Sequence, residues 1–428
     1  MPETFANPSN LLTFIFAAAL ICSLALKFWL ASRQIRHVVR HRSAVPRAFA
    51  EVMPLAAHQK AADYTVTKTR FGMVELAWGG VVALGWTLLG GLNALSEWVT
   101  LTWGVGLVSQ VALMGLFIAI NAAMDLPFSL YGTFVIEKDF GFNKTTPKLW
   151  LQDFAKSLVL GLLIGAPLLT LVLWLMQAAG SVWWLWTWGV WMGFNVLAML
   201  IYPTWIAPWF NKFQALEDAN LAARVQALMQ RCGFRAEGFY VMDGSKRSAH
   251  ANAYFTGFGA SKRVVFYDTL LARLSADEVD AVLAHELGHF AHRHILKRVV
   301  SLFALSLLGF ALLGFMGTQV WFYTGLGVLP NLAGANDALA LLLFMLALPP
   351  FTAFIGPVFS WISRRDEFEA DAYAVRHSNG THLSSALLKL YEDNAATLTP
   401  DPWYVRFYYS HPPALQRLNR MTNQGNPA

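Results

Sequence analysis

The 428-residue sequence has few charged residues and very few cysteines. Charged side chains make up only 14% of the chain, whereas hydrophobic ones make up 56% and form long runs. This composition excludes an ordinary soluble enzyme and is typical of an integral membrane protein. Cys22 lies in an apolar run and Cys232 in a polar region. A structural disulfide and metal binding through cysteine are therefore not expected.

The first ten residues contain Glu3 but no lysine or arginine. A cleaved signal peptide has a basic start and a short apolar core, so the apolar run 11–31 is predicted to be a retained membrane span. The net charge of +6 does not indicate nucleic-acid binding, because the Lys and Arg residues cluster beside hydrophobic runs. We expect no nucleic-acid partner. The lipid bilayer is the expected environment.

Long apolar runs predict seven transmembrane helices. Their approximate limits are 11–31, 72–95, 101–125, 156–177, 182–202, 299–323 and 338–360. Lys and Arg are concentrated in the segments between them, which places these segments in the cytoplasm and the N-terminus outside. The cytoplasmic segments are 33–70, 126–154, 203–297 and 361–428. The compartment is expected to be the inner membrane of a bacterium or the endoplasmic reticulum of a eukaryote.

The polar region contains the motif His285-Glu286-Leu287-Gly288-His289. Residues four apart share a face of a helix, so both imidazoles can reach one Zn²⁺. Glu286 would then lie beside the open coordination position, where it can take a proton from water and pass it to the leaving amine. Ser275 and Glu278 have the spacing of a capping box and predict the start of this helix.

A catalytic zinc site needs a third protein ligand. His292 lies on the same helical face, but about 10 Å further along the axis, which is too far for the same ion. His292 and His294 are interpreted as outer-sphere or ordinary polar residues. The spacing after the last span leaves Glu367, Glu369 and Asp371 open as the third ligand, in what is expected to be a new helix near Ser363.

The polar region between the fifth and sixth spans is predicted to contain an amphipathic helix and three short strands. We expect the helix at 216–232 and the strands at 239–242, 251–255 and 264–267, followed by a zinc helix that runs straight into the sixth span. The chain then divides into membrane region 1–202, metallopeptidase core 203–297, two spans in 298–360, and segment 361–428 completing the catalytic part. The expected fold is predominantly α-helical, with seven transmembrane helices and a zincin-like domain that carries a small β-sheet.

Three motifs together resemble the type I CAAX prenyl protease family of integral-membrane zinc metallopeptidases. They are His285-Glu286-x-x-His289, Ser363-Arg364-x-x-Glu367-x-x-Ala370-Asp371, and His411-Pro412-Pro413 followed by Arg417. Asn252-Ala253-Tyr254-Phe255 and Gly141-Phe142-Asn143-Lys144 fit the same family. The likeness covers nearly the whole chain.

The resemblance implies one role for each matching residue. Glu367 becomes the third zinc ligand beside His285 and His289, with Asp371 behind them. His411 would steady the tetrahedral intermediate, with support from Arg417. Asn252 and Ala253 would receive the substrate backbone on an edge strand. The family also implies a large water-filled chamber between the membrane helices.

The expected function is therefore that of a zinc metalloendopeptidase that binds one Zn²⁺ per chain and hydrolyses peptide bonds at the membrane. The family implies peptide or protein substrates that include C-terminally prenylated CAAX peptides. One alternative is a quality-control protease that cleaves membrane proteins without prenyl groups. Another is a transporter or silent scaffold, which accounts for the spans but leaves three metal motifs without use.

Overall fold

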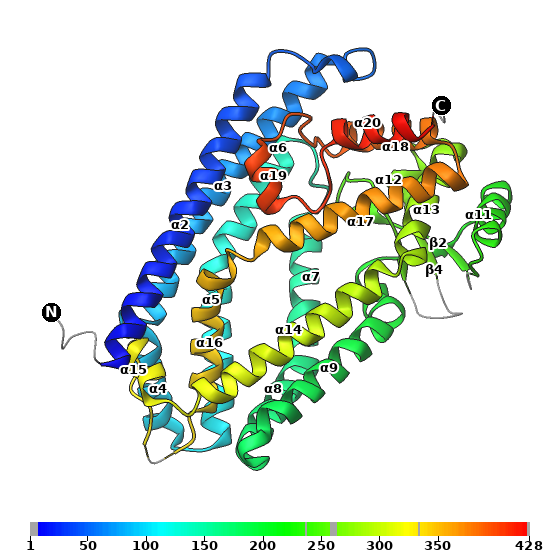
Figure 1. Cartoon of the computed structure of the whole chain (residues 1–428). Coiled ribbons are helices and arrows are strands. Elements are labelled where there is room, and N and C mark those ends of the chain that lie inside the picture. The colour runs from blue at the N-terminus through cyan, green and yellow to red at the C-terminus, as the bar shows by residue number, and fades with distance from the viewer. Residues whose placement is uncertain (1–6, 236–237, 257–262, 333, 426–428) are drawn as a thin grey trace.

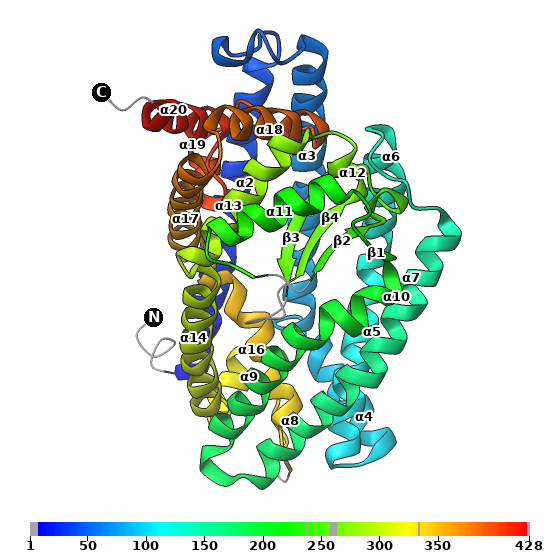
Figure 2. The same ribbon diagram turned by 90° about the vertical axis from the view of Figure 1, so that its right-hand side faces the viewer.

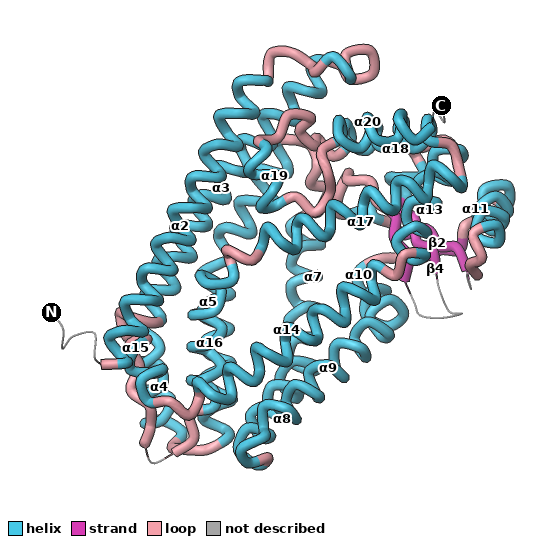
Figure 3. The backbone as a smooth tube through the Cα atoms, viewed as in Figure 1, coloured by secondary structure: helices cyan, strands magenta, loops and turns pink. Residues whose placement is uncertain are grey.

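The computed structural model describes residues 7–235, 238–256, 263–332 and 334–425. The first six residues, with Glu3, lie outside this range. Two regions are visible: a frame of long helices, and a smaller region of short helices and strands at the upper right (Figure 1). The strands are confined to the smaller region (Figure 3).

Ten helices build the membrane region in the part of the chain that the structure describes. They are α2 (Pro8–His41), α3 (Leu55–Trp86), α4 (Gly91–Trp103), α5 (Leu107–Tyr131), α7 (Pro147–Leu160), α8 (Ala166–Ala178), α9 (Trp183–Ile201), α14 (His294–Met316), α16 (Asp337–Thr352) and α17 (Gly356–His377). Three π-helical turns, Gly132–Ile136, Gly161–Gly165 and Tyr202–Ile206, join α5 to α6 (Glu137–Asp139), α7 to α8, and α9 to α10 (Ala207–Phe210). Short α15 (Val320–Gly325) follows α14.

Within the described residues, five helices are long and apolar enough to cross a membrane, and the number rises to seven when each of two bent pairs counts as one span. α3 and α4 form the first pair, bent by 49°, and α16 and α17 form the second, bent by 68°. The fold class is confirmed, and the expected seven spans agree with the number obtained when each bent pair counts as one span. Prolines 349 and 350 lie inside α16, and the bend follows after Thr352.

The structure corrects three boundaries. The zinc helix does not run straight into the sixth span, because it ends at Ala291 and α14 begins at His294 after the left-handed residue Arg293. The sixth span does not reach residue 323, since α14 ends at Met316. No new helix begins near Ser363, because that residue lies inside α17, which also carries Glu367.

The smaller region contains a four-stranded sheet in the order β1-β2-β4-β3. Its strands are β1 (Phe213–Ala215), β2 (Gly238–Met242), β3 (Ala253–Thr256) and β4 (Arg263–Tyr267), of which β1 was not expected from the sequence. β2 and β4 are parallel, and β3 pairs antiparallel with β4, with Ala253 opposite Phe266. Among the described residues, β3 is therefore an edge strand with no strand paired to its outer side.

Five more helices surround the sheet. They are α11 (Ala219–Arg231), α12 (Asp268–Leu271), α13 (Ala276–Ala291), α18 (Gly380–Asp393) and α20 (Ala414–Gly425). Buried Val225, Phe266 and Leu287 belong to one hydrophobic core shared by α11, β4 and α13. Figure 2 shows α11 and α13 next to the strands. The core holds α13 in a fixed place above the membrane helices.

The C-terminal segment is tied back to the first span. Arg33 of α2 donates to both carboxylate oxygens of Asp401, at 3.3 and 3.0 Å. The Asp401 amide donates to Gln34 at 2.7 Å, and Asp401 also caps α19 (Pro402–Tyr408). These contacts fix the chain that leads to His411.

Candidate metal centre

α13 begins with a capping box, as the sequence predicts. The Ser275 hydroxyl accepts from the Glu278 amide at 3.4 Å, and the Glu278 carboxylate accepts from the Ser275 amide at 2.7 Å. Lys389 and Ser385 of α18 also donate to Glu278, at 2.8 and 2.7 Å. Although burial opposes the shift, these hydrogen bonds lower the pKa of Glu278 to about 2. The helix that carries the HExxH motif is therefore anchored at its first turn.

Gly288 lets α13 and α17 approach closely. A Cβ atom at Gly288 would lie 2.9 Å from Ala370 Cα, 3.0 Å from Tyr373 Cβ and 3.1 Å from the Ala370 carbonyl oxygen. Only glycine fits between these atoms without displacing them. The close approach brings Glu367 of α17 against the two histidines of α13.

The donor atoms of His285, His289 and Glu367 lie within 4.8 Å of one another. His285 Nε2 is 3.3 Å from Glu367 Oε2, and His289 Nε2 is 3.4 Å from Glu367 Oε1. Bonds of about 2.0–2.2 Å to a tetrahedral zinc ion place neighbouring donors about 3.3 Å apart. Glu367 Oε2 is buried and has no hydrogen-bond donor. These residues therefore fit a zinc ion.

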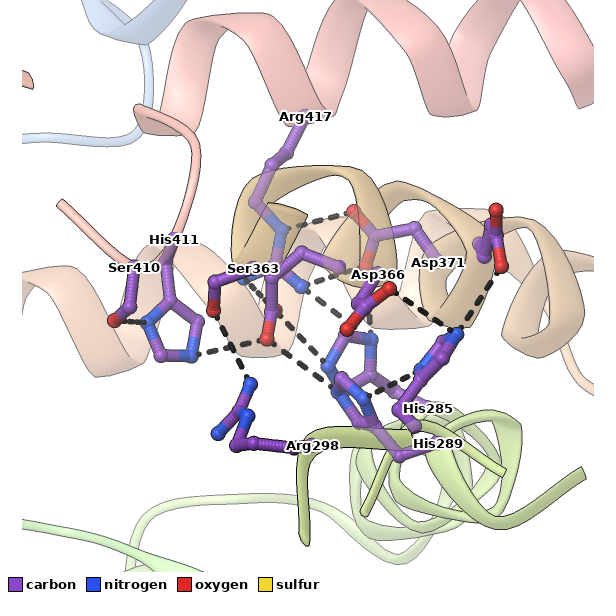
Figure 4. Close-up of polar contacts among 12 residues, drawn as sticks. His285, His289, Arg298, Ser363, Asp366, Asp371, Ser410, His411 and Arg417 are labelled. Atoms are coloured by element: carbon purple, nitrogen blue, oxygen red, sulfur yellow. Dashed lines mark hydrogen bonds and ion pairs between the residues drawn. The ribbon is translucent and has the colours of Figure 1, made fainter. Parts of the chain in front are cut away.

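Asp371 and Arg417 support His285 from behind (Figure 4). Asp371 Oδ1 lies 2.9 Å from His285 Nδ1, which leaves Nε2 to face the metal position. The buried Arg417 donates twice to Asp371, at 2.6 and 2.9 Å. Burial alone would lower the pKa of His285, but the adjacent carboxylates of Asp371 and Glu367 raise it to about 9. In the metal-free site His285 therefore holds a proton, which it must lose before a metal ion can bind.

His411 reaches the centre from the loop between α19 and α20. Its Nε2 lies 3.3 Å from Glu367 Oε1, and its Nδ1 lies 2.9 Å from the Ser410 hydroxyl. Although its side chain is 61% exposed, desolvation beside the other site residues and the positive charge of Arg417 lower the pKa of His411 despite the nearby Glu367. A neutral ring whose Nδ1 accepts from Ser410 carries its hydrogen on Nε2, the nitrogen closer to the metal position.

Glu286 faces a cavity of about 610 Å³. Asn252 and Ala253, at the start of the edge strand β3, line the same cavity, as does His411. Of the predicted ligands, His285 lines the cavity, and so does Arg417. His289 and Glu367 lie next to His285, and Asp371 lies behind it. The structure thus brings the predicted site residues to one place. The large chamber that the resemblance implies stays a prediction.

The sequence did not predict a second cluster of possible metal-binding residues beside the centre. His294, Asp366 and Glu369 bring donor atoms within 4.8 Å of one another, next to His289. The sequence analysis interpreted His294 as an outer-sphere or ordinary polar residue, and the structure places its Nδ1 3.0 Å from His289 Nδ1. Glu369 was one of three possible ligands, and the structure instead places its carboxylate on His294, at 3.1 Å.

Comparison with known proteins identifies the family. Residues 34–212 match a model described as CAAX prenyl protease N-terminal, five membrane helices, and residues 215–424 match peptidase family M48. CAAX prenyl protease 1 of Saccharomyces cerevisiae is 38% identical over 332 residues, which cover 74% of this chain and 73% of the yeast protein. The chain belongs to the CAAX prenyl protease 1 family of M48 peptidases.

Members of the CAAX prenyl protease 1 family match across nearly the full length. The Caenorhabditis elegans homolog is 31% identical, covering 94% of this chain and 96% of the relative. The crystal structure of S. mikatae Ste24p superposes with a TM-score of 0.88 at 32% identity, covering 96% and 99% of the two chains. The chain is therefore a membrane metallopeptidase with a Ste24p-like fold, and His285, His289 and Glu367 form its candidate metal site.

Proposed function

We propose that the chain hydrolyses peptide bonds at a zinc ion held by His285, His289 and Glu367, with Glu286 as the general base. The observation that carries this proposal is the convergence of three donor atoms within 4.8 Å beside a cavity that Glu286 lines. When bound, zinc supplies Lewis-acid polarisation of water and of the substrate carbonyl.

The protein residues act on a substrate strand in the cavity. The open edge of β3 at Asn252 and Ala253 pairs with the extended substrate backbone and aligns the scissile bond. Glu286 removes a proton from the attacking water and delivers it to the leaving amine. His411 donates through Nε2 to the carbonyl oxygen as negative charge develops there.

The first test compares wild-type protein with Glu286→Gln. Both should contain one zinc ion per chain and have the same melting temperature. The variant should lose about 10²–10⁴ in rate, because the general base is gone while the ligands remain. Hydrolysis at a near-normal rate, in a preparation free of other proteases, would rule out the mechanism. Absence of zinc from active wild-type protein would rule out the metal site.

We further propose that the substrates are C-terminally prenylated CAAX peptides. The support is that the yeast, worm and human relatives are all named CAAX prenyl proteases or homologs. A farnesylated CAAX peptide should be cleaved with a higher kcat/KM than the same peptide without the lipid. Equal rates for both would instead favour a quality-control protease.

We also propose that the N-terminus lies outside and that segments 33–70, 126–154, 203–297 and 361–428 lie in the cytoplasm. The clustering of Lys and Arg supports this orientation. So does the position of the described N-terminal end, which is in the half opposite to the metal centre (Figure 1). In a cysteine-free background, single cysteines near positions 50 and 220 should react from the same side. Labelling from opposite sides would contradict the topology.

A further inference from the structure

A chain of hydrogen bonds leads away from the metal ligand His289. His289 Nδ1 lies 3.0 Å from His294 Nδ1, and His294 Nε2 lies 3.1 Å from Glu369 Oε2. His294 is only 2% exposed, so its ring has no access to bulk water as an alternative partner. Both nitrogens of His294 are therefore engaged, one with a metal ligand and one with a carboxylate.

The backbone between α13 and α14 creates this contact. In one continuous helix, residues five apart would point about 140° away from each other. Here α13 ends at Ala291, and Arg293 takes the left-handed conformation with φ 56° and ψ 34° before α14 begins. This conformation is unfavourable for a residue with a Cβ atom. The break turns the His294 ring back onto His289.

The positions of the hydrogens follow from the metal site. When His289 binds a metal through Nε2, its Nδ1 carries the ring hydrogen and donates it. His294 Nδ1 must then accept, and a neutral imidazole that accepts at Nδ1 carries its hydrogen on Nε2. That hydrogen is donated to Glu369. A single arrangement of hydrogens thus satisfies all three residues.

The same reasoning argues against a second cation on His294, Asp366 and Glu369, although their donor atoms lie within 4.8 Å of one another. A cation on His294 Nε2 would leave the ring hydrogen on Nδ1, where it would face the Nδ1–H of His289 at 3.0 Å. Removing that hydrogen as well would turn His294 into an anionic imidazolate. The hydrogen-bonded chain requires neither two facing N–H groups nor an imidazolate anion.

We propose that His294 is a positioning residue that fixes the ring orientation and tautomer of His289, with Glu369 anchoring its far side. The inference rests on the proposed metal site. Each histidine ligand is then backed by a carboxylate, His285 directly by Asp371 and His289 through the His294 ring. Losing His294 frees the His289 ring to rotate, which weakens its bond to the metal.

The test follows zinc release from the full-length, zinc-loaded protein into excess chelator. His294→Leu should release zinc about 10- to 100-fold faster than wild type, the usual consequence of losing a hydrogen-bond partner of a metal ligand. His294→Asn should restore most of the wild-type behaviour, because its side-chain oxygen occupies the place of Nδ1 and accepts from His289. A purely structural histidine would not be rescued in this way.

His292→Leu is the matched control. His292 stacks on the His294 ring, with centroids 5.5 Å apart, but its Nδ1 lies 4.0 Å from Glu369 Oε2, too far for a hydrogen bond, so this variant removes packing without breaking the chain. Its zinc release should stay at the wild-type rate. The melting temperature and the absorption spectrum of the Co²⁺-substituted protein are recorded for each variant. A changed cobalt spectrum in His294→Leu, restored in His294→Asn, identifies an altered metal site in folded protein.

The outcomes separate this inference from the proposed function. Wild-type protein with one zinc ion and an unchanged release rate in folded His294→Leu would remove His294 from its role and leave the hydrolytic mechanism intact. Two zinc ions in wild type, one of them lost in Glu369→Gln, would replace the hydrogen-bonded chain by a second cation site. Failure of wild-type protein to bind zinc would overturn the proposed function itself.

Discussion

The glycine between the two histidine ligands provides a sensitive test of the site. Gly288→Ala would place a methyl carbon 2.9 Å from Ala370 Cα, whereas ordinary contacts of this kind begin at 3.4 Å. The obstacle is backbone, so α13 and α17 must separate by about half an ångström. Metal ligands tolerate displacements of only about 0.2 Å. Zinc affinity should therefore fall about tenfold or more.

The expected change in folding stability is smaller. Overpacking costs about 1–3 kcal/mol, while replacing a helical glycine by alanine returns about 1 kcal/mol. The net destabilisation is thus at most about 2 kcal/mol. Zinc titration against a competing chelator, together with melting curves of the zinc-free protein, measures both effects separately.

Gly309→Ala on α14 is the matched control, since its added Cβ meets nothing within 4 Å. It should bind zinc with wild-type affinity. Excess zinc should restore part of the activity of Gly288→Ala. If Gly288→Ala bound zinc as tightly as the control, the close approach of the two helices would not set the ligand geometry, and the argument would fail.

Three further results are expected. His411→Ala should lower kcat about 10²–10³-fold with zinc content unchanged, because one donor to the developing oxyanion is lost; an unchanged kcat per zinc-loaded molecule would remove His411 from the site. The lowered pKa of Glu278, about 2 against an ordinary 4.5, should stabilise the fold above pH 4.5 and lose this contribution as pH falls toward 2. The loss of unfolding free energy should reach about 3 kcal/mol in wild type. Glu278→Gln should lack this pH dependence, and an equal pH dependence of the melting temperature in both proteins would contradict the prediction. Arg293→Gly should relieve left-handed strain at φ 56° and leave stability equal or higher, while Arg293→Val should destabilise by about 1–2 kcal/mol, as thermal unfolding can show.

Sequence reasoning anticipated the fold class and the number of spans, because apolar runs are long and the bilayer allows few alternatives to helices. It also anticipated α13 from its capping box, which is a local signal. The structure also brings together the residues that were expected around the metal position. Spacing alone left Glu367, Glu369 and Asp371 as possible third ligands, and only the family motif selected Glu367. The roles of these residues remain to be tested.

The errors concern places where tertiary contacts decide. Nothing in the local sequence shows that Arg293 is left-handed, so the break between α13 and α14 and the inward turn of His294 were not expected. The sequence around Gly288 does not indicate that Ala370 of α17 packs against it. The helix that follows the bend after Thr352 was taken as two separate elements, the end of the last span and a new helix near Ser363.

Three helices form a closed frame. α14 and α16 meet near the end remote from the catalytic region, α16 turns by 68° into α17, and α17 meets α13 where α14 begins (Figure 1). His285 and His289 lie on one side of that last junction and Glu367 on the other. The relative positions of these helices stay fixed only while the contacts between their ends persist. A metal ion bound by these three residues would therefore also hold α13 and α17 together, and the membrane helices should become more mobile when it is removed.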